Sequence, residues 1–248
     1  MSSPSAHPEL QSLVELLQGQ RVKRSRRRRP GALSRDQLVR TAMGLADNEG
    51  QYAISMRRIA AEVGVGTMTL YGYVPGREAL LAYMLDEALA EIELPAPPSG
   101  GWRADLELAA HELRAVCRRH LWVPALLGST PVLLAPRWIR TLEFCLAALE
   151  PFGLDVRQAA AMVRMLNNYV VGTTLRQSSE LRVRDLGDDP VAHQTVVAAF
   201  LQQVVLSERY PAFSKLARVM LDDHDFDQDE SFDIGLRCLL DGIEVQRD

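Results

Sequence analysis

The sequence is poor in cysteine and has no long uncharged apolar run. Cys117, Cys145 and Cys238 are the only cysteines in 248 residues, and no two of them have the C-x-x-C spacing of a zinc site or a redox motif. This sparse, odd set predicts reduced, buried thiols rather than a disulfide framework. No apolar run reaches the roughly 20 residues of a membrane span, and the charged, proline-containing N-terminus does not resemble a signal peptide. We therefore expect a cytoplasmic protein with no membrane partner.

Motifs of the common enzyme classes are also missing. The sequence contains no G-x-S-x-G elbow, no glycine-rich phosphate loop and no H-E-x-x-H. The acidic run at residues 222–230 lacks the glycine and the terminal spacing of a calcium loop, so we expect a solvated loop there. With 47% hydrophobic and 24% charged residues, the composition is that of an ordinary globular protein. The sequence predicts neither an enzyme nor a metal or other cofactor.

Positive side chains are slightly outnumbered by negative ones overall but are concentrated near the N-terminus. The formal net charge is −4, yet residues 18–80 hold 12 Lys and Arg against 5 Asp and Glu, a local net charge of +7. Seven of these positive charges lie in residues 21–29, which we expect to be disordered because like charges repel one another. A basic region of this kind favours a nucleic-acid partner.

Next to this basic run, residues 54–74 predict two short helices joined by a glycine turn. Apolar residues repeat at helical spacing on both sides of the turn; they are Ile59, Ala60 and Val63 before it, and Leu70 and Val74 after it. Ser55 is placed to cap the first helix, and Gly64 supplies the positive φ that the turn requires. Small polar and aromatic groups then begin the second helix. The pattern is that of a helix-turn-helix, although any pair of packed helices shares part of it.

The flanking segments complete a small helical module. Ser34-Arg-Asp-Gln37 has the form of a capping box and predicts a helix that ends at Gly50. Pro75-Gly76 breaks the chain, and a further helix is predicted from Arg77 to Glu93. Three short helices with a fourth leading away form a module of about 60 residues.

The segment from Leu70 to Leu80, LYGYVPGREAL, resembles the recognition-helix signature of TetR-family transcriptional regulators, and the match extends from Leu33 to Glu91. The C-terminal part resembles the ligand-binding domain of the tetracycline-repressor branch, through residues 102–106, 119–122, 169–172, 210–213 and 232–243. The resemblance implies an all-α fold with an N-terminal three-helix helix-turn-helix domain and a C-terminal helical ligand-binding and dimerisation domain. The domains expected are an N-terminal extension with a basic arm (1–32), the DNA-binding domain (33–93) and the ligand-binding domain (94–248).

Several side chains of the module are candidates for contact with double-stranded DNA. Thr67, Met68 and Thr69 begin the second helix, where side chains reach base edges. The resemblance assigns a base contact to Arg57 and phosphate contacts to Tyr71, Tyr73 and Arg77. A solvated helix face is the alternative for Arg57, and packing under the helix is the alternative for Tyr73. Gly72 departs from the family pattern, so we expect a bend there or no base contact.

The basic run offers a second DNA contact. Arg26, Arg27, Arg28 and Arg29 lie just ahead of the module, where an arm follows phosphates or enters the minor groove. The alternative is a solvated tail that adds only weak, salt-sensitive attraction.

After a Pro- and Gly-rich linker at residues 94–101, helical periodicity predicts helices near 102–119, 122–128, 136–150, 155–178, 190–208 and 230–246. The helix from 155 and the last helix are apolar around much of their girth, so they need partners on more than one side. The resemblance implies that these late helices pair in a homodimer, whose two-fold symmetry fits a near-palindromic operator. The alternative is that they complete a monomeric core.

A pocket for a small effector is implied by the resemblance. The candidate lining residues are aromatic, apolar or amide side chains that serve equally well as core: Trp102, Trp122, Trp138, Phe144, Met162, Met165 and Asn168. We expect a repressor that releases its operator when an apolar or amphipathic molecule binds. The competing hypothesis is a helical small-molecule-binding or interaction protein with a vestigial helix-turn-helix.

Overall fold

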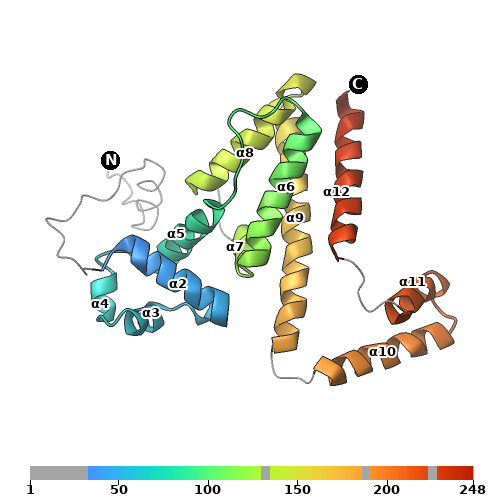
Figure 1. Ribbon diagram of the computed structural model, residues 1–248, viewed down its shortest axis with the longest axis horizontal. Helices are drawn as coiled ribbons and strands as arrows, with labels where there is room; N and C mark the ends of the chain where they lie inside the picture. The colour runs from blue at the N-terminus through green and yellow to red at the C-terminus, as the bar shows by residue number, and fades with distance from the viewer. Residues whose placement is uncertain (1–32, 130–134, 186–189, 223–227, 248) are drawn as a thin grey trace, which may run out of the picture. The chain divides into compact units, whose positions relative to one another are not determined.

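The computed structural model describes residues 33–129, 135–185, 190–222 and 228–247. Within these ranges the chain consists of helices joined by turns, without a strand (Figure 1). The predicted all-α class is confirmed. The chain forms two compact units, one reaching Leu175 and the other running from Arg176 to Gln246. No helix of the described ranges is long and apolar enough to cross a membrane.

The first unit begins with a head of short helices, which we define as residues 33–76. Its elements are α2 (Arg35–Glu49), the 3₁₀ turn η1 (Gln51–Ala53), α3 (Met56–Glu62) and α4 (Thr67–Leu70). The Ser34 hydroxyl accepts a hydrogen bond from the Gln37 amide at 3.0 Å, which caps α2 as the sequence predicts. Gly50, with φ +79°, ends the same helix where we expected.

Helix α5 (Arg77–Leu89) joins the head to the rest of the unit. It contacts α2 in the head and α6, α7 and α8 outside it. Its buried residues cover most of its circumference: Ala79, Leu80, Leu81, Tyr83, Met84, Leu85, Asp86, Ala88 and Leu89. It ends at Leu89 rather than at the predicted Glu93.

The remainder of the first unit follows the predicted helices closely. Its elements are α6 (Trp102–Arg119), α7 (Val123–Ser129), α8 (Pro136–Leu149), the 3₁₀ turn η3 (Glu150–Phe152) and α9 (Val156–Asp185), whose last residues belong to the second unit. The bounds of α6 are those predicted. Helix α9 runs seven residues beyond the predicted end at 178, because no glycine or proline follows residue 178 until Gly187.

The second unit also contains α10 (Pro190–Leu206), α11 (Pro211–Asp222), α12 (Gln228–Glu244) and the 3₁₀ turn η4 (Val245–Arg247). The sequence analysis predicted no helix at residues 211–222, and this was wrong. Pro211 begins α11 at the first helical position, where its missing N–H would have no partner within the helix. Helices α10 and α11 pack against each other. In α12, Phe232, Leu236, Leu240 and Ile243 form one buried stripe.

A buried carboxylate fixes α8 to α5. Asp86 is only 8% exposed, and its carboxylate accepts a hydrogen bond from the Arg137 amide at 2.9 Å, which caps the first turn of α8. Burial raises the pKa of Asp86, and the bond from Arg137 opposes this change. Nearby, Arg140 of α8 donates to the Ile92 carbonyl at 2.7 Å, just beyond α5. Helix α8 therefore holds both α5 and the segment that follows it.

Two replacements of Asp86 distinguish the effect of its hydrogen bond on stability from the effect of its charge. Asp86→Asn keeps an acceptor for the Arg137 amide and removes the desolvated charge, so thermal unfolding should occur at the same temperature or higher. Asp86→Ala loses the cap and should cost about 1–2 kcal/mol. Because its pKa is raised in the fold, ionised Asp86 costs stability above that pKa, and the cost disappears as the pH falls. The difference in unfolding temperature between wild type and Asp86→Asn should therefore become smaller as the pH falls. Equal destabilisation by Asp86→Asn and Asp86→Ala would contradict the role of Asp86 as a hydrogen-bonding cap of α8.

The three cysteines lie in different environments. Cys117 and Cys145 are buried, as the sequence predicts, whereas Cys238 is exposed, so the prediction of burial was wrong for that thiol. Cys238 lies away from the buried stripe of α12, on a side that the helical pattern alone could not orient. Burial raises the pKa of Cys117 and that of Cys145 to about 12 each, which keeps both as unreactive thiols.

We expect Cys117 and Cys145 to resist iodoacetamide at mildly alkaline pH in the native protein, because their thiolates are not populated. Peptide mass spectrometry should find both residues unmodified until the protein is unfolded in guanidinium, when both react. Rapid native alkylation of either residue would show that its surroundings open readily.

Candidate nucleic-acid interface

The helix-turn-helix has the predicted geometry at its turn. The Ser55 hydroxyl caps α3 by accepting from the Arg58 amide at 3.2 Å. The Val65 amide donates to the Ala60 carbonyl at 3.0 Å, and Gly64 between them has φ +70°. A side chain with a Cβ is strained in that conformation, so glycine is favoured there.

A fully buried apolar cluster supports this turn. Ile59 of α3, Leu70 of α4 and Val74 after it are each 0% exposed, as are Leu38 of α2 and Leu80 of α5. These residues come from every helix around the turn, so the helix-turn-helix is fixed by the core of the head rather than by local hydrogen bonds alone.

The opposite face of α4 is open to solvent. Met68 is 81% exposed, Tyr71 is 47% exposed, Thr69 is exposed and Thr67 is half-buried. Exposing a large apolar side chain to water at the tip of a short helix does not stabilise the fold. Together these groups form a small polar and apolar surface of the kind that reads base edges in the major groove.

Helix α4 ends earlier than the apolar spacing indicates. Its regular part stops at Leu70, and residues 71–73 form a turn in which the Gly72 amide donates to the Thr69 carbonyl at 3.2 Å. A Cβ at Gly72 would lie 3.3 Å from that same carbonyl oxygen, which is a tight contact. Glycine at this position therefore accompanies a bend in the chain, one of the two explanations that the sequence left open.

The two arginines of α3 have different surroundings. Arg57 is exposed. Arg58 forms ion pairs with Glu62 at 2.6 Å and with Glu49 at 2.9 Å, and its hydrogen bonds to these carboxylates raise its pKa. Arg58 thus links α3 to the end of α2, whereas Arg57 is oriented outward and accessible to a ligand of the head.

Two predicted phosphate contacts also serve the fold. The Arg77 Nε donates to the Ile54 carbonyl at 2.9 Å, which ties the start of α5 to the segment before α3. Tyr73 is half-buried, and its amide donates to the Leu70 carbonyl at 2.8 Å. The predicted arm, Arg26, Arg27, Arg28 and Arg29, lies outside the described residues.

The candidate effector residues do not gather at one described cavity. Trp122 is 0% exposed, and Trp138 and Phe144 of α8 are buried. Trp102 packs edge-on against Phe152, with ring centroids 5.0 Å apart. The three candidates on α9 have more open surroundings, with Met162 half-buried and both Met165 and Asn168 exposed.

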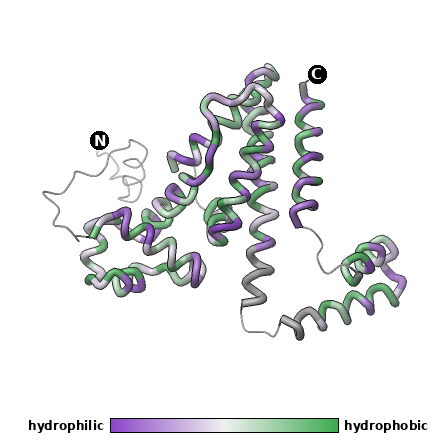
Figure 2. Tube along the Cα trace, viewed as in Figure 1, coloured by the Kyte–Doolittle hydropathy of each residue, from purple (hydrophilic) through white to green (hydrophobic). Residues whose placement is uncertain are grey.

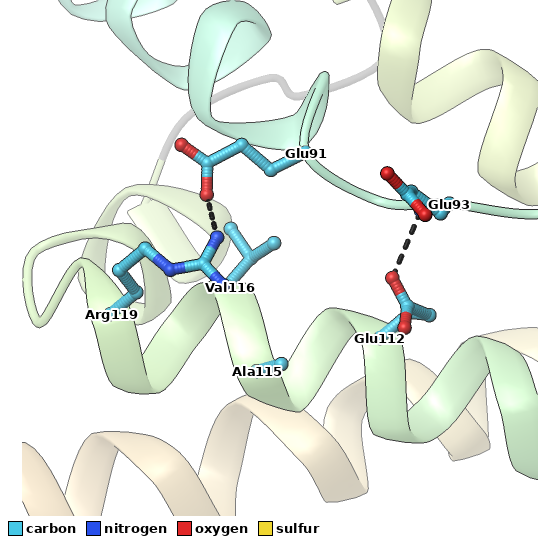
Figure 3. Close-up of a pocket in the computed structure, with 6 residues that line it drawn as sticks. All are labelled: Glu91, Glu93, Glu112, Ala115, Val116 and Arg119. Atoms are coloured by element: carbon cyan, nitrogen blue, oxygen red, sulfur yellow. Dashed lines mark hydrogen bonds and ion pairs between the residues drawn. The ribbon is translucent and has the colours of Figure 1, made fainter.

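A different set of residues lines a surface pocket of about 450 Å³ between α6 and the segment after α5 (Figure 3). Its lining is mainly ionic: Glu91, Glu93, Glu112, Ala115, Val116 and Arg119. Arg119 pairs with Glu91, and the Glu112 carboxylate accepts from the Glu93 amide at 2.9 Å. The sequence did not single out these glutamates, because the two segments are far apart in the chain and charged residues on a helix face are usually solvated.

The chain was compared with known proteins. Residues 38–84 match the family described as "Bacterial regulatory proteins, tetR family", and residues 94–247 match "Tetracyclin repressor-like, C-terminal domain". The chain is 37% identical over 243 residues to the HTH-type transcriptional repressor DrrR1 of Streptomyces coeruleorubidus, covering 97% of this chain and 88% of that protein. It is 25% identical to the class D tetracycline repressor protein of Escherichia coli, covering 86% and 90% of the two chains.

Solved structures show the same relationship. The TetR family protein ActR of Streptomyces coelicolor, crystallised in complex with actinorhodin, is 29% identical and superposes with a TM-score of 0.71, covering 88% of this chain and 99% of ActR. The match spans most of both chains.

Two substitutions at the exposed surface of α4 and the turn after it test two kinds of DNA contact separately. Tyr71→Phe removes only a hydroxyl and should weaken binding to all duplexes alike, because a phosphate contact carries no sequence information. Thr67→Ala should reduce the discrimination between base pairs at one operator position by about 1–3 kcal/mol. Selection from a random duplex pool, followed by anisotropy titration of the selected sequence, measures both effects.

Tyr52→Phe is the matched control, because Tyr52 lies in η1 and is 83% exposed but outside the predicted contact set. It should change neither affinity nor preference. Wild-type behaviour of the Tyr71 and Thr67 variants would show that α4 is not the reading element.

Proposed function

Because the chain belongs to the TetR family of bacterial transcriptional regulators, we propose that it represses transcription from a near-palindromic operator until a small effector binds its C-terminal part. Family membership makes it a ligand-responsive DNA-binding regulator and not an enzyme. It acts as a homodimer on double-stranded DNA, and we place this activity in the cytoplasm.

The observation that carries the proposal is the exposed face of α4 above a fully buried core. Met68 and Tyr71 remain in solvent while Leu70, between them in sequence, is 0% exposed. A groove of duplex DNA covers such a protruding surface, with the threonines of α4 at base edges. Arg57 on α3 and the four arginines of the arm add the positive charge that phosphates attract.

A dimer partner is supported by the apolar surface of the late helices. Large apolar side chains are exposed on α9 to α12: Val156, Met165, Leu175, Val196, Val197, Phe200, Leu206, Phe213, Leu216, Val219, Met220 and Ile234. Apolar residues dominate the described part of α10 (Figure 2). Monomeric proteins rarely leave so much apolar surface in water. We assign the dimer interface to these helices, and two-fold symmetry then presents two heads to the halves of one operator.

The effector site is assigned to the helices beyond α5. ActR was crystallised with actinorhodin, which supports a small-molecule effector for this chain as well. The candidate residues on α6 to α9 supply apolar and aromatic surface with one amide, which suits an apolar or amphipathic molecule. Binding there must favour a conformer that no longer fits the operator, by the coupling free energy between the two sites.

Helix α5 is the physical route for that coupling. It contacts α2 in the head as well as α6, α7 and α8, and α8 carries the candidates Trp138 and Phe144. A displacement of α6 or α8 by an effector therefore moves α5, and with it the angle of the head.

A titration with the selected duplex tests this function. We expect saturable binding that keeps its preference over a scrambled duplex at moderate salt, while the affinity for both falls with added salt. Actinorhodin, with which ActR was crystallised, and tetracycline, from the name of the class D repressor, serve as effector probes. At least one should lower operator affinity about fivefold or more, as a coupling of 1–3 kcal/mol requires. Binding that is blind to sequence and lost in salt would instead support the helical binding protein with a vestigial helix-turn-helix.

A further inference from the structure

Gly72 lies in a turn that continues the register of α4. The Gly72 amide donates to the Thr69 carbonyl at 3.2 Å. The Val74 amide donates at 2.9 Å to the carbonyl of Leu70, four residues earlier. Residues four apart therefore share a side of this segment, as they do in a helix. Leu70 and Val74, each 0% exposed, form the inner side, whereas Gly72 and Met68, which is 81% exposed, form the outer side.

The backbone at position 72 does not itself favour glycine. Gly64 in the preceding turn has φ +70°, where a Cβ is strained, but the φ of Gly72 is negative. Among the described residues, a Cβ placed at Gly72 would meet one atom within 4 Å, the Thr69 carbonyl oxygen at 3.3 Å. Beyond that contact the side chain would extend into solvent, because Gly72 is exposed. The fold therefore restrains a larger residue here by one contact only, with the carbonyl of an exposed neighbour.

Space on the outer side of α4 becomes limiting when the head meets DNA. An α-helix with its side chains is about 10–12 Å across, and the major groove of B-DNA is about 12 Å wide and about 8.5 Å deep. A helical element therefore fills the groove, and each side chain on its outer side adds to the distance between the main chain and the base edges. Where the outer side holds glycine, the main chain approaches a ligand more closely.

The exposed neighbours of Gly72 suit such a close approach. Met68 and Thr69 precede it by four and three residues, the spacing at which side chains lie next to each other on one face. With no side chain at position 72, the flexible Met68 thioether is free to lie against a thymine methyl group, and Thr69 to reach a base edge. A bulky residue at position 72 would compete with Met68 for the same space.

We propose that Gly72 is a specificity-determining position of the head. Its missing side chain lets the main chain of the turn after α4 approach the duplex, and this sets how deeply Met68 and Thr69 enter the groove. Depth governs contact with base edges, whereas phosphates are met at the rim of the groove, so a side chain at position 72 reduces discrimination between sequences more than general attraction to DNA. This inference rests on the proposed operator binding, and it adds the residue that controls the depth of contact.

Gly72→Ala and Gly72→Leu form a size series that tests this proposal by anisotropy titration at constant salt. Affinity for the selected duplex should fall as the side chain grows, by about tenfold or more for Gly72→Leu, as the loss of one base-pair contact requires. Affinity for a scrambled duplex should change less than about threefold, because phosphate contacts supply it. Selection from the random pool with Gly72→Leu should return an altered preferred sequence.

Gly44→Leu is the matched control. Gly44 lies in α2, outside the predicted contact set, and a Cβ there would meet nothing within 4 Å. This variant should keep the wild-type affinity for both duplexes and the wild-type preferred sequence.

Thermal unfolding supplies a readout that does not depend on DNA. Gly72→Ala restricts the unfolded chain, which stabilises the fold, and presses a Cβ against the Thr69 carbonyl, which opposes that gain. The unfolding midpoint should therefore move by no more than about 4 °C. A larger fall, with equal losses of affinity for both duplexes, would make Gly72 a purely structural residue and overturn the inference.

The DNA titrations separate failure of this inference from failure of the proposed function. Specific binding by wild type, with the same affinity and preference in Gly72→Leu, would refute the role of Gly72 and leave the proposed function intact. If wild type itself does not distinguish the selected duplex from the scrambled one, the proposed function fails and this inference fails with it.

Discussion

The burial of α5 on most of its surface is the constraint on which the other features of the first unit depend. Leu80, Met84 and Leu89 are 0% exposed, and the helix contacts α2 of the head as well as α6, α7 and α8. A densely packed helix cannot shift without moving its neighbours, since protein interiors have little free volume. The head and the candidate effector helices are therefore mechanically connected through one shared core element.

Hydrogen bonds along α5 fix its position relative to the elements it contacts. Arg77 bonds the Ile54 carbonyl at the start of α5, and Asp86 caps α8 from its middle. Beyond its end, Arg140 reaches the Ile92 carbonyl and His120 reaches Glu91. Hydrogen bonds weaken steeply when their angle or length changes. The head is thus expected to occupy discrete orientations, which a regulator needs if ligand binding is to shift a population.

Features of the head that depend on nearby residues were predictable. Ser34 and Ser55 cap their helices, and Gly64 takes the positive φ of the turn, because each of these roles is decided within about four residues. The buried stripe with Ile59 and Leu70 followed from helical spacing. Since that stripe faces inward, the outward orientation of Met68 and Tyr71 followed as well. Most of the candidate DNA surface could therefore be assigned before any tertiary structure was known.

The sequence by itself determined the all-α class, the limits of α6 and the side chains that α4 exposes to solvent, because helical periodicity and caps are local. Tertiary structure decided the early end of α4, the exposure of Cys238 and the hydrogen bond from the buried Trp122 indole to Asp47 of the head. It also decided that Asp47, Glu91 and His120 meet. These residues are separated by 29 to 73 positions, and local spacing carries no information about contacts that only the packing of α2, α5 and α6 creates.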